Sequence, residues 1–280
     1  MRTVFKSALL IYYISASILA IFIVLFGVDF AFVPWDKTVL GLKPWHPVIS
    51  ILAYIFSIAF SAKLAETYAR KKHDKIYTIL NDECDPQKFL QVYQKIVGRG
   101  TGKNRSFTYF YNGYGYYELG DFQTARQQFD LMYTTGLPKT FGAAQYIVFY
   151  HLYVCDILLY ENDIDNAEQA LLLAMEAVKN PKLSKKGMAM SFGQYIMARQ
   201  MRLNMEKGNY EGSEQFFTTS FEISDTIIKK VINKFHLGRV YLHYNRIVEA
   251  KAAFEYVKEH GNKTFYVDRS INFIKQCTEK

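Results

Sequence analysis

Residues 106–139 read SFTYFYNGYGYYELGDFQTARQQFDLMYTTGLPK, and this stretch decides the fold. Aromatic and small residues recur at helical spacing on both sides of a Gly120-Asp121 turn. We expect Gly120 to end one helix in the left-handed conformation and Asp121 to cap the next helix. Gly113 and Ala125 are small where the two helices would touch. The stretch therefore predicts a helix–turn–helix pair.

The same frame, with Gly113 at position 8, fits three further segments. The four predicted repeats are 106–139, 148–181, 194–227 and 231–264. Each keeps a turn in the middle and an alanine or serine after it. The pattern resembles the tetratricopeptide repeat of about 34 residues, and the chain is similar to bacterial membrane-anchored proteins of that family. A generic helical bundle is the alternative interpretation.

Two further segments complete the predicted repeat domain, residues 106–280. Residues 265–278 are expected to form a capping helix, because the exposed end of such an array needs a polar cover. Residues 66–105 are expected to form a linking helix pair, and the sequence leaves open whether it is a further repeat. The resulting fold class is all-α: a tetratricopeptide-like α-solenoid of about four helix pairs behind an N-terminal hairpin.

The N-terminal hairpin, residues 1–65, is predicted to cross a membrane twice. The apolar runs 4–28 and 47–64 approach or exceed the length of about 20 residues that a bilayer requires. Seven basic residues flank the two apolar runs outside the connecting loop, whereas the loop itself holds two. The positive-inside rule therefore places both termini and the repeat domain in the cytoplasm of a multi-pass protein of the cell membrane.

The family resemblance implies that the first helix of each pair lines a groove that binds a partner. The partner-binding positions carried over from it are Phe107, Phe110, Tyr114, Tyr117, Asp156, Tyr160, Arg202, Phe235, Arg239 and His243. Aromatic and arginine side chains are favoured anchors at interfaces. The expected function is a membrane-anchored scaffold that binds an unknown protein or peptide.

Other functions have less support in the sequence. The loop 98–104 lacks the first glycine and the final serine or threonine of a phosphate loop. We find no catalytic residues and no metal or cofactor motif, so we expect neither enzyme activity nor a cofactor. The net charge is +8 overall, but residues 81–280 hold only +3 of it. That near-neutral balance argues against nucleic acid as the partner. Nucleic acid or another non-protein ligand remains the alternative to a protein.

Overall fold

The computed structural model describes most of the chain from residue 74 onward. The described ranges are 74–97, 105–137, 144–180 and 188–279, with isolated residues at 13, 14, 17, 60, 63, 64, 67 and 71. Residues 76–95 and 99–280 form one compact unit, and residues 1–75 with 96–98 form another. The first of these units contains a cavity and the helices that line it.

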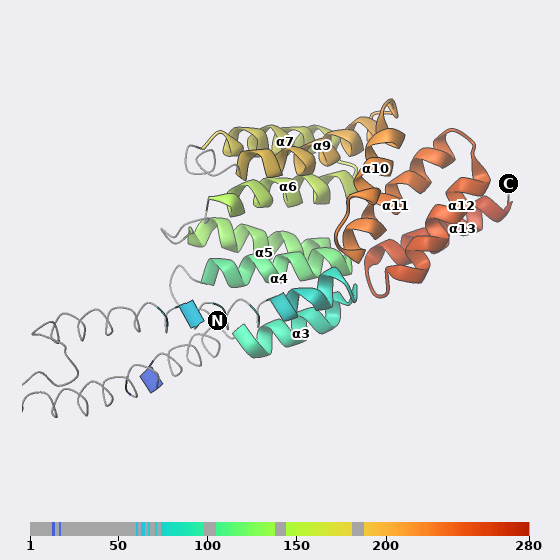
Figure 1. The fold of residues 1–280 in the computed structure, drawn as a ribbon. Coiled ribbons are helices and arrows are strands. Elements are labelled where there is room, and N and C mark those ends of the chain that lie inside the picture. Colours follow the sequence, from blue (N-terminus) through green and yellow to red (C-terminus); the bar gives the residue numbers. More distant parts are fainter. Residues whose placement is uncertain are drawn as a thin grey trace, which may run out of the picture. The chain divides into compact units, whose positions relative to one another are not determined.

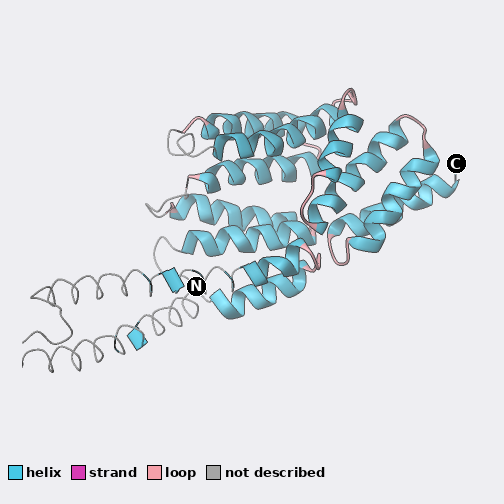
Figure 2. Ribbon diagram, in the orientation of Figure 1, coloured by secondary structure: helices cyan, strands magenta, loops and turns pink. Residues whose placement is uncertain are grey.

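The described part of the unit consists of helices joined by turns and loops (Figure 2). The helices are α3 (Pro86–Val97), α4 (Arg105–Leu119), α5 (Phe122–Thr135), α6 (Gln145–Tyr160), α7 (Ile164–Val178), α9 (Met188–Glu206), α10 (Ser213–Glu222), α11 (Ile227–His243), α12 (Ile247–His260) and α13 (Phe265–Glu279). Helical residues 74–81 precede α3. The prediction of an all-α chain is confirmed for this part.

Helices α4 to α7 follow one another as neighbouring layers (Figure 1). α4 packs on α5, α6 on α7, and α11 on α12. The turns within the pairs share one backbone feature: the residue at position 15 of every predicted repeat has a positive φ. The four residues and their φ angles are Gly120 (+85°), Asn162 (+60°), Gly208 (+82°) and Asn245 (+59°). Each predicted repeat therefore turns at the same position, which explains why the sequence pattern recurs with the same spacing.

The residue after the turn caps the next helix in the first two pairs. Asp121 accepts a hydrogen bond from the backbone N–H of Thr124 at 3.0 Å. Asp163 does the same for Asn166 at 3.3 Å. Each aspartate satisfies a backbone donor that the first helical turn leaves without a partner. The predicted cap at Asp121 is confirmed.

Close helix contact depends on glycine in the first and fourth pairs. A Cβ at Gly113 would lie 2.7 Å from Cε1 of Phe129, and one at Gly238 would lie 2.6 Å from the Phe254 ring. Both phenylalanines are fully buried. The missing side chains therefore let large rings fill the space between paired helices, as the sequence predicted for Gly113.

The third pair departs from this arrangement. α10 packs mainly against α11 and less against α9 (Figure 1). It is a short helix that starts after Gly212, a residue in the left-handed conformation with φ +72°. Phe217 of α10 is buried beside Leu237 and Val240 of α11. α10 thereby joins the first half of the array to the last.

The unit also closes on itself through the segment between α12 and α13. Lys263 Nζ donates to Asp85 Oδ2 at 2.7 Å, and Asn262 Nδ2 donates to the Glu83 carbonyl at 2.8 Å. Phe265 packs edge-on against Phe122 with ring centroids 5.2 Å apart. A Cβ at Gly120 would lie 2.7 Å from Cβ of Phe265. The segment between α12 and α13 is thus held against the turn before α3, and Phe265 of α13 against the first pair, which the sequence did not indicate.

The predicted spans 4–28 and 47–64 fall outside the described residues, apart from isolated positions. Among the residues that the structure does describe, none of the helices combines the length and apolar character that crossing a bilayer requires.

Candidate ligand-binding cavity

A cavity of about 390 Å³ lies inside the closed unit. Most of its walls come from α4, α6, α9 and α11, which are the first helices of the four pairs. Single residues from other segments, among them Tyr77, Phe217 of α10 and Tyr266, complete the lining. Much of the lining is aromatic. The aromatic lining residues are Tyr77, Phe110, Tyr111, Tyr114, Tyr117, Tyr146, Phe149, Tyr153, Tyr195, Phe217 and Tyr266. Its volume is in the range of sites that hold small ligands or a few side chains of a partner.

One wall carries a buried cluster of three charges. Asp156 of α6 is fully buried, and its carboxylate pairs with Arg199 at 2.6 Å and with Arg202. Both arginines lie on α9, within one helical turn of each other. Burial favours their neutral forms, yet the adjacent Asp156 carboxylate holds the pKa of each guanidinium above its ordinary value. Two guanidinium groups against one carboxylate leave an excess of one positive charge.

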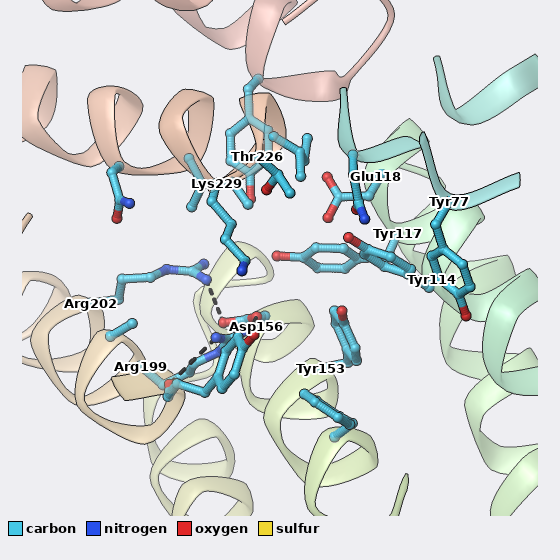
Figure 3. A pocket seen from close by; sticks show the side chains of 18 of the residues that line it. Tyr77, Tyr114, Tyr117, Glu118, Tyr153, Asp156, Arg199, Arg202, Thr226 and Lys229 are labelled. Atoms are coloured by element: carbon cyan, nitrogen blue, oxygen red, sulfur yellow. Dashed lines mark hydrogen bonds and ion pairs between the residues drawn. The ribbon is translucent and has the colours of Figure 1, made fainter. Parts of the chain in front are cut away.

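Glu118 of α4 faces this cluster across the cavity (Figure 3). It is 1% exposed, and its Oε2 has no hydrogen-bond partner among the described residues. Burial and the nearby charge of Asp156 raise its pKa to about 8, although Arg199 and Arg202 oppose the shift. Glu118 is therefore mostly protonated at neutral pH and can donate a hydrogen bond.

Other polar groups on the lining also lack partners within the described part of the chain. They are the Tyr117 hydroxyl, the Thr226 hydroxyl, both ring nitrogens of His236 and Nε of Arg199 and Arg202. Burial and surrounding arginines hold the pKa of His236 well below its ordinary value, so its ring is neutral. Buried polar groups normally find a hydrogen-bond partner, so this concentration is unusual for a packed interior.

Lys229 of α11 reaches the cavity from the side opposite Tyr114 and Tyr117 (Figure 3). Its Nζ donates to Asp225 Oδ1 at 2.7 Å, and Lys229 is only half-buried. The hydrogen bond to Asp225 contributes to its raised pKa, against the effect of burial. The lysine is charged, but Asp225 balances it.

Five of the residues predicted from the sequence line the cavity: Phe110, Tyr114, Tyr117, Asp156 and Arg202. They come from α4, α6 and α9. The structure therefore brings together the middle of the predicted groove.

The other five lie elsewhere. Phe107 is half-buried against Tyr146, with ring centroids 4.9 Å apart. Phe235 is 1% exposed and belongs to the core.

The remaining three predicted residues have local partners. Tyr160 stacks on Phe122 with ring centroids 5.0 Å apart. Arg239 pairs with Glu206 at 2.8 Å, and exposed His243 stacks on Tyr210 at 3.8 Å. The predicted groove residues of the fourth repeat, Phe235, Arg239 and His243, therefore serve packing and surface pairs.

Sequence reasoning missed a whole row of lining residues. Position 6 of the four repeats holds Tyr111, Tyr153, Arg199 and His236, and all four line the cavity. The family resemblance assigns the groove to positions that include 2 and 9 of each repeat, such as Phe107 and Tyr114 of the first. Position 6 follows position 2 by four residues and precedes position 9 by three, so it shares their helix face. A polar or aromatic side chain at each of these four positions was the available signal.

The described residues offer no arrangement for metal or thiol chemistry. Within them, no group of three His, Cys, Asp or Glu side chains could hold a metal ion. Cys84 and Cys155 are buried, and burial raises the pKa of each thiol to about 12. Thiols with such pKa values are not nucleophiles at neutral pH.

The cavity can supply aromatic surface, hydrogen-bond donors and one excess positive charge. No family model, curated protein or solved structure matches this chain.

Proposed function

We propose that this chain is a membrane-anchored binding protein whose helical repeat domain takes up part of a partner polypeptide on its inner surface. The proposal treats the four helix pairs as tetratricopeptide-like repeats and assigns binding rather than catalysis to the array. It places the repeat domain in the cytoplasm, tethered by the two apolar segments 4–28 and 47–64.

The observation that carries the proposal is the cavity between the first helices of the pairs. Its walls hold buried polar atoms without partners, including the Tyr117 hydroxyl and Glu118 Oε2. Groups of this kind each cost free energy unless a partner satisfies them, by about 1–3 kcal/mol. A protein that keeps several of them around one space is best explained by a ligand that enters it.

A polypeptide is favoured as the ligand by the aromatic lining and by the layout of the chain. Rings such as Tyr114 and Tyr195 present rigid, amphipathic surface, which is typical of protein recognition sites. A tether near a membrane raises the effective concentration of the domain beside other membrane proteins. Both features suit a scaffold.

Affinity purification of the full-length protein tests this proposal. Ala198 is half-buried and lines the cavity, so Ala198→Trp fills the space with a bulky ring. Ala252 on α12 is exposed and lies away from the cavity, so Ala252→Trp is the matched control. We expect one stoichiometric partner with the wild type and with Ala252→Trp, and its loss with Ala198→Trp at unchanged helicity. Equal recovery with both variants would contradict the proposal.

A further inference from the structure

The charged wall of the cavity has features that define a ligand chemistry. Arg199 and Arg202 share the single carboxylate of Asp156, and Lys229 is balanced by Asp225. Glu118 retains its proton because burial and Asp156 raise its pKa to about 8, and His236 is neutral. One positive charge therefore remains without a counter-charge in a buried place, which is costly.

Four groups on the same lining can each donate a hydrogen bond. The Tyr117 and Thr226 hydroxyls and the Nε atoms of Arg199 and Arg202 have no partners within the described part of the chain. Tyr117 is 2% exposed and Arg202 is 4% exposed, so both side chains lie in the interior of the unit. Protonated Glu118 adds a further donor on the facing wall (Figure 3).

A cation or a metal ion does not suit this space, because Arg199, Arg202 and Lys229 would all repel it. An anion satisfies both the charge and the donors. One excess charge matches a monoanion better than a doubly charged phosphate. The adjoining rings of Phe110, Phe149 and Tyr153 offer an apolar surface to the remainder of the ligand.

We propose that the cavity recognises a carboxylate attached to an apolar or aromatic body, held by Arg199, Arg202 and Tyr117, with its body against the rings of α4 and α6. This inference rests on the proposed binding role of the inner surface and names the chemistry that it recognises. The carboxylate can belong to a free organic acid or to the end of a polypeptide.

Calorimetric titration of the full-length protein in a non-ionic detergent tests this inference. The acid probes are 3-phenylpropionate, indole-3-acetate, octanoate and N-acetylphenylalanine, each compared with its amide, and 3-phenylpropylamine and phenyl phosphate are the contrasting charges. A hydrogen bond between two charged groups is stronger than one to a neutral amide. We therefore expect at least one acid to bind tenfold or more tightly than its amide, with no binding of the amine.

Two arginine variants separate the cavity from a general charge effect. Arg199→Gln removes the excess positive charge and should weaken the acid at least tenfold. Arg239→Gln is the matched control, because Arg239 is also a partly buried arginine paired with one carboxylate, but it does not line the cavity. It should change the affinity less than twofold. Tyr117→Phe is a second variant, because it removes only a hydroxyl that has no partner within the described part of the chain, and it should weaken the acid as well.

The outcomes decide the inference. Tenfold tighter binding of N-acetylphenylalanine than of 3-phenylpropionate would assign the carboxylate to a polypeptide end, and the reverse order to a free acid. No binding of any acid, equal binding of acid and amide, tighter binding of phenyl phosphate, or an equal loss with Arg239→Gln would overturn it. Acid binding without any captured polypeptide would keep this inference and remove the proposed scaffold function; a captured polypeptide without acid binding would do the opposite.

Discussion

The carboxylate of Asp156 accepts a hydrogen bond of 2.6 Å from Arg199, and this contact joins α6 to α9 inside the cavity wall. Asp156 also pairs with Arg202, and the two buried partners leave its side chain 1% exposed. The ion cluster is therefore structural as well as part of the candidate site.

Replacing Asp156 by alanine should destabilise the protein strongly, because it leaves two arginines without their counter-charge. Breaking a buried ion pair on one side costs about 3–5 kcal/mol. Glu176→Ala is the matched control, since its pair with Lys179 at 2.7 Å is about 70% exposed on both sides. It should cost less than about 1 kcal/mol. Urea unfolding of both variants measures the difference, and similar midpoints would contradict the burial of the cluster.

The stability of the protein should fall with pH in a way that depends on Glu118. The pKa of this carboxyl is raised from 4.5 to about 8 by burial and by Asp156. Its contribution is therefore fully present below about pH 4.5 and is lost as the pH rises through about 8. Glu118→Gln cannot ionise. Relative to that variant, the wild type should lose stability between pH 5 and pH 9, by an amount of the order of a few kcal/mol. A difference that does not change with pH would exclude a buried, protonated Glu118.

The contact between Gly120 and Phe265 should make Gly120→Ala more harmful than Gly208→Ala. Both glycines have a positive φ, +85° and +82°, so both substitutions carry a backbone cost of about 1–2 kcal/mol. Only the Cβ at position 120 would lie 2.7 Å from Phe265, whereas the one at 208 would meet nothing within 4 Å. Overpacking should add about 1–3 kcal/mol to Gly120→Ala alone. Equal thermal unfolding of the two variants would mean that Phe265 of α13 does not pack against the turn at Gly120.

Much of the local fold followed from the sequence. Spacing and residue type predicted the turn at Gly120, the cap at Asp121 and the contact at Gly113, because each depends on residues close together in the chain. The contact between Lys263 and Asp85, which closes the unit, was not predicted. These residues lie 178 positions apart, and they form one ion pair between an exposed lysine and a buried aspartate.

Of the candidate site, only residues in the middle of the predicted groove were identified from the sequence. Tyr114, Asp156 and Arg202 lie at a frame position that points inward in the first three pairs, so the repeat frame located them. The same position in the fourth pair holds Arg239, which Glu206 engages instead. Arg199 and His236 were missed because the frame carried over from the family resemblance omitted position 6, although it lies on the same helix face.

Cysteine labelling in intact cells tests the membrane topology that the sequence predicts. The three native cysteines are buried, so their background reaction with a membrane-impermeant maleimide should be low. A cysteine in place of Asp36, in the loop between the apolar segments, should react from outside. A cysteine in place of exposed Ala252 should react only after permeabilisation. Labelling of position 252 in intact cells would reverse the topology, and release of the chain by alkaline carbonate would remove the membrane anchor.

Site-directed photo-crosslinking in the full-length, membrane-resident protein tests the central claim most directly. A photoreactive phenylalanine derivative would replace Tyr195, which lines the cavity, or Tyr133, which is 48% exposed on α5 and lies outside it. If the inner surface binds a partner polypeptide, position 195 yields one defined adduct that Ala198→Trp abolishes, and position 133 does not yield it. The absence of an adduct at position 195, or the same adducts at both positions, would contradict a binding function for the cavity.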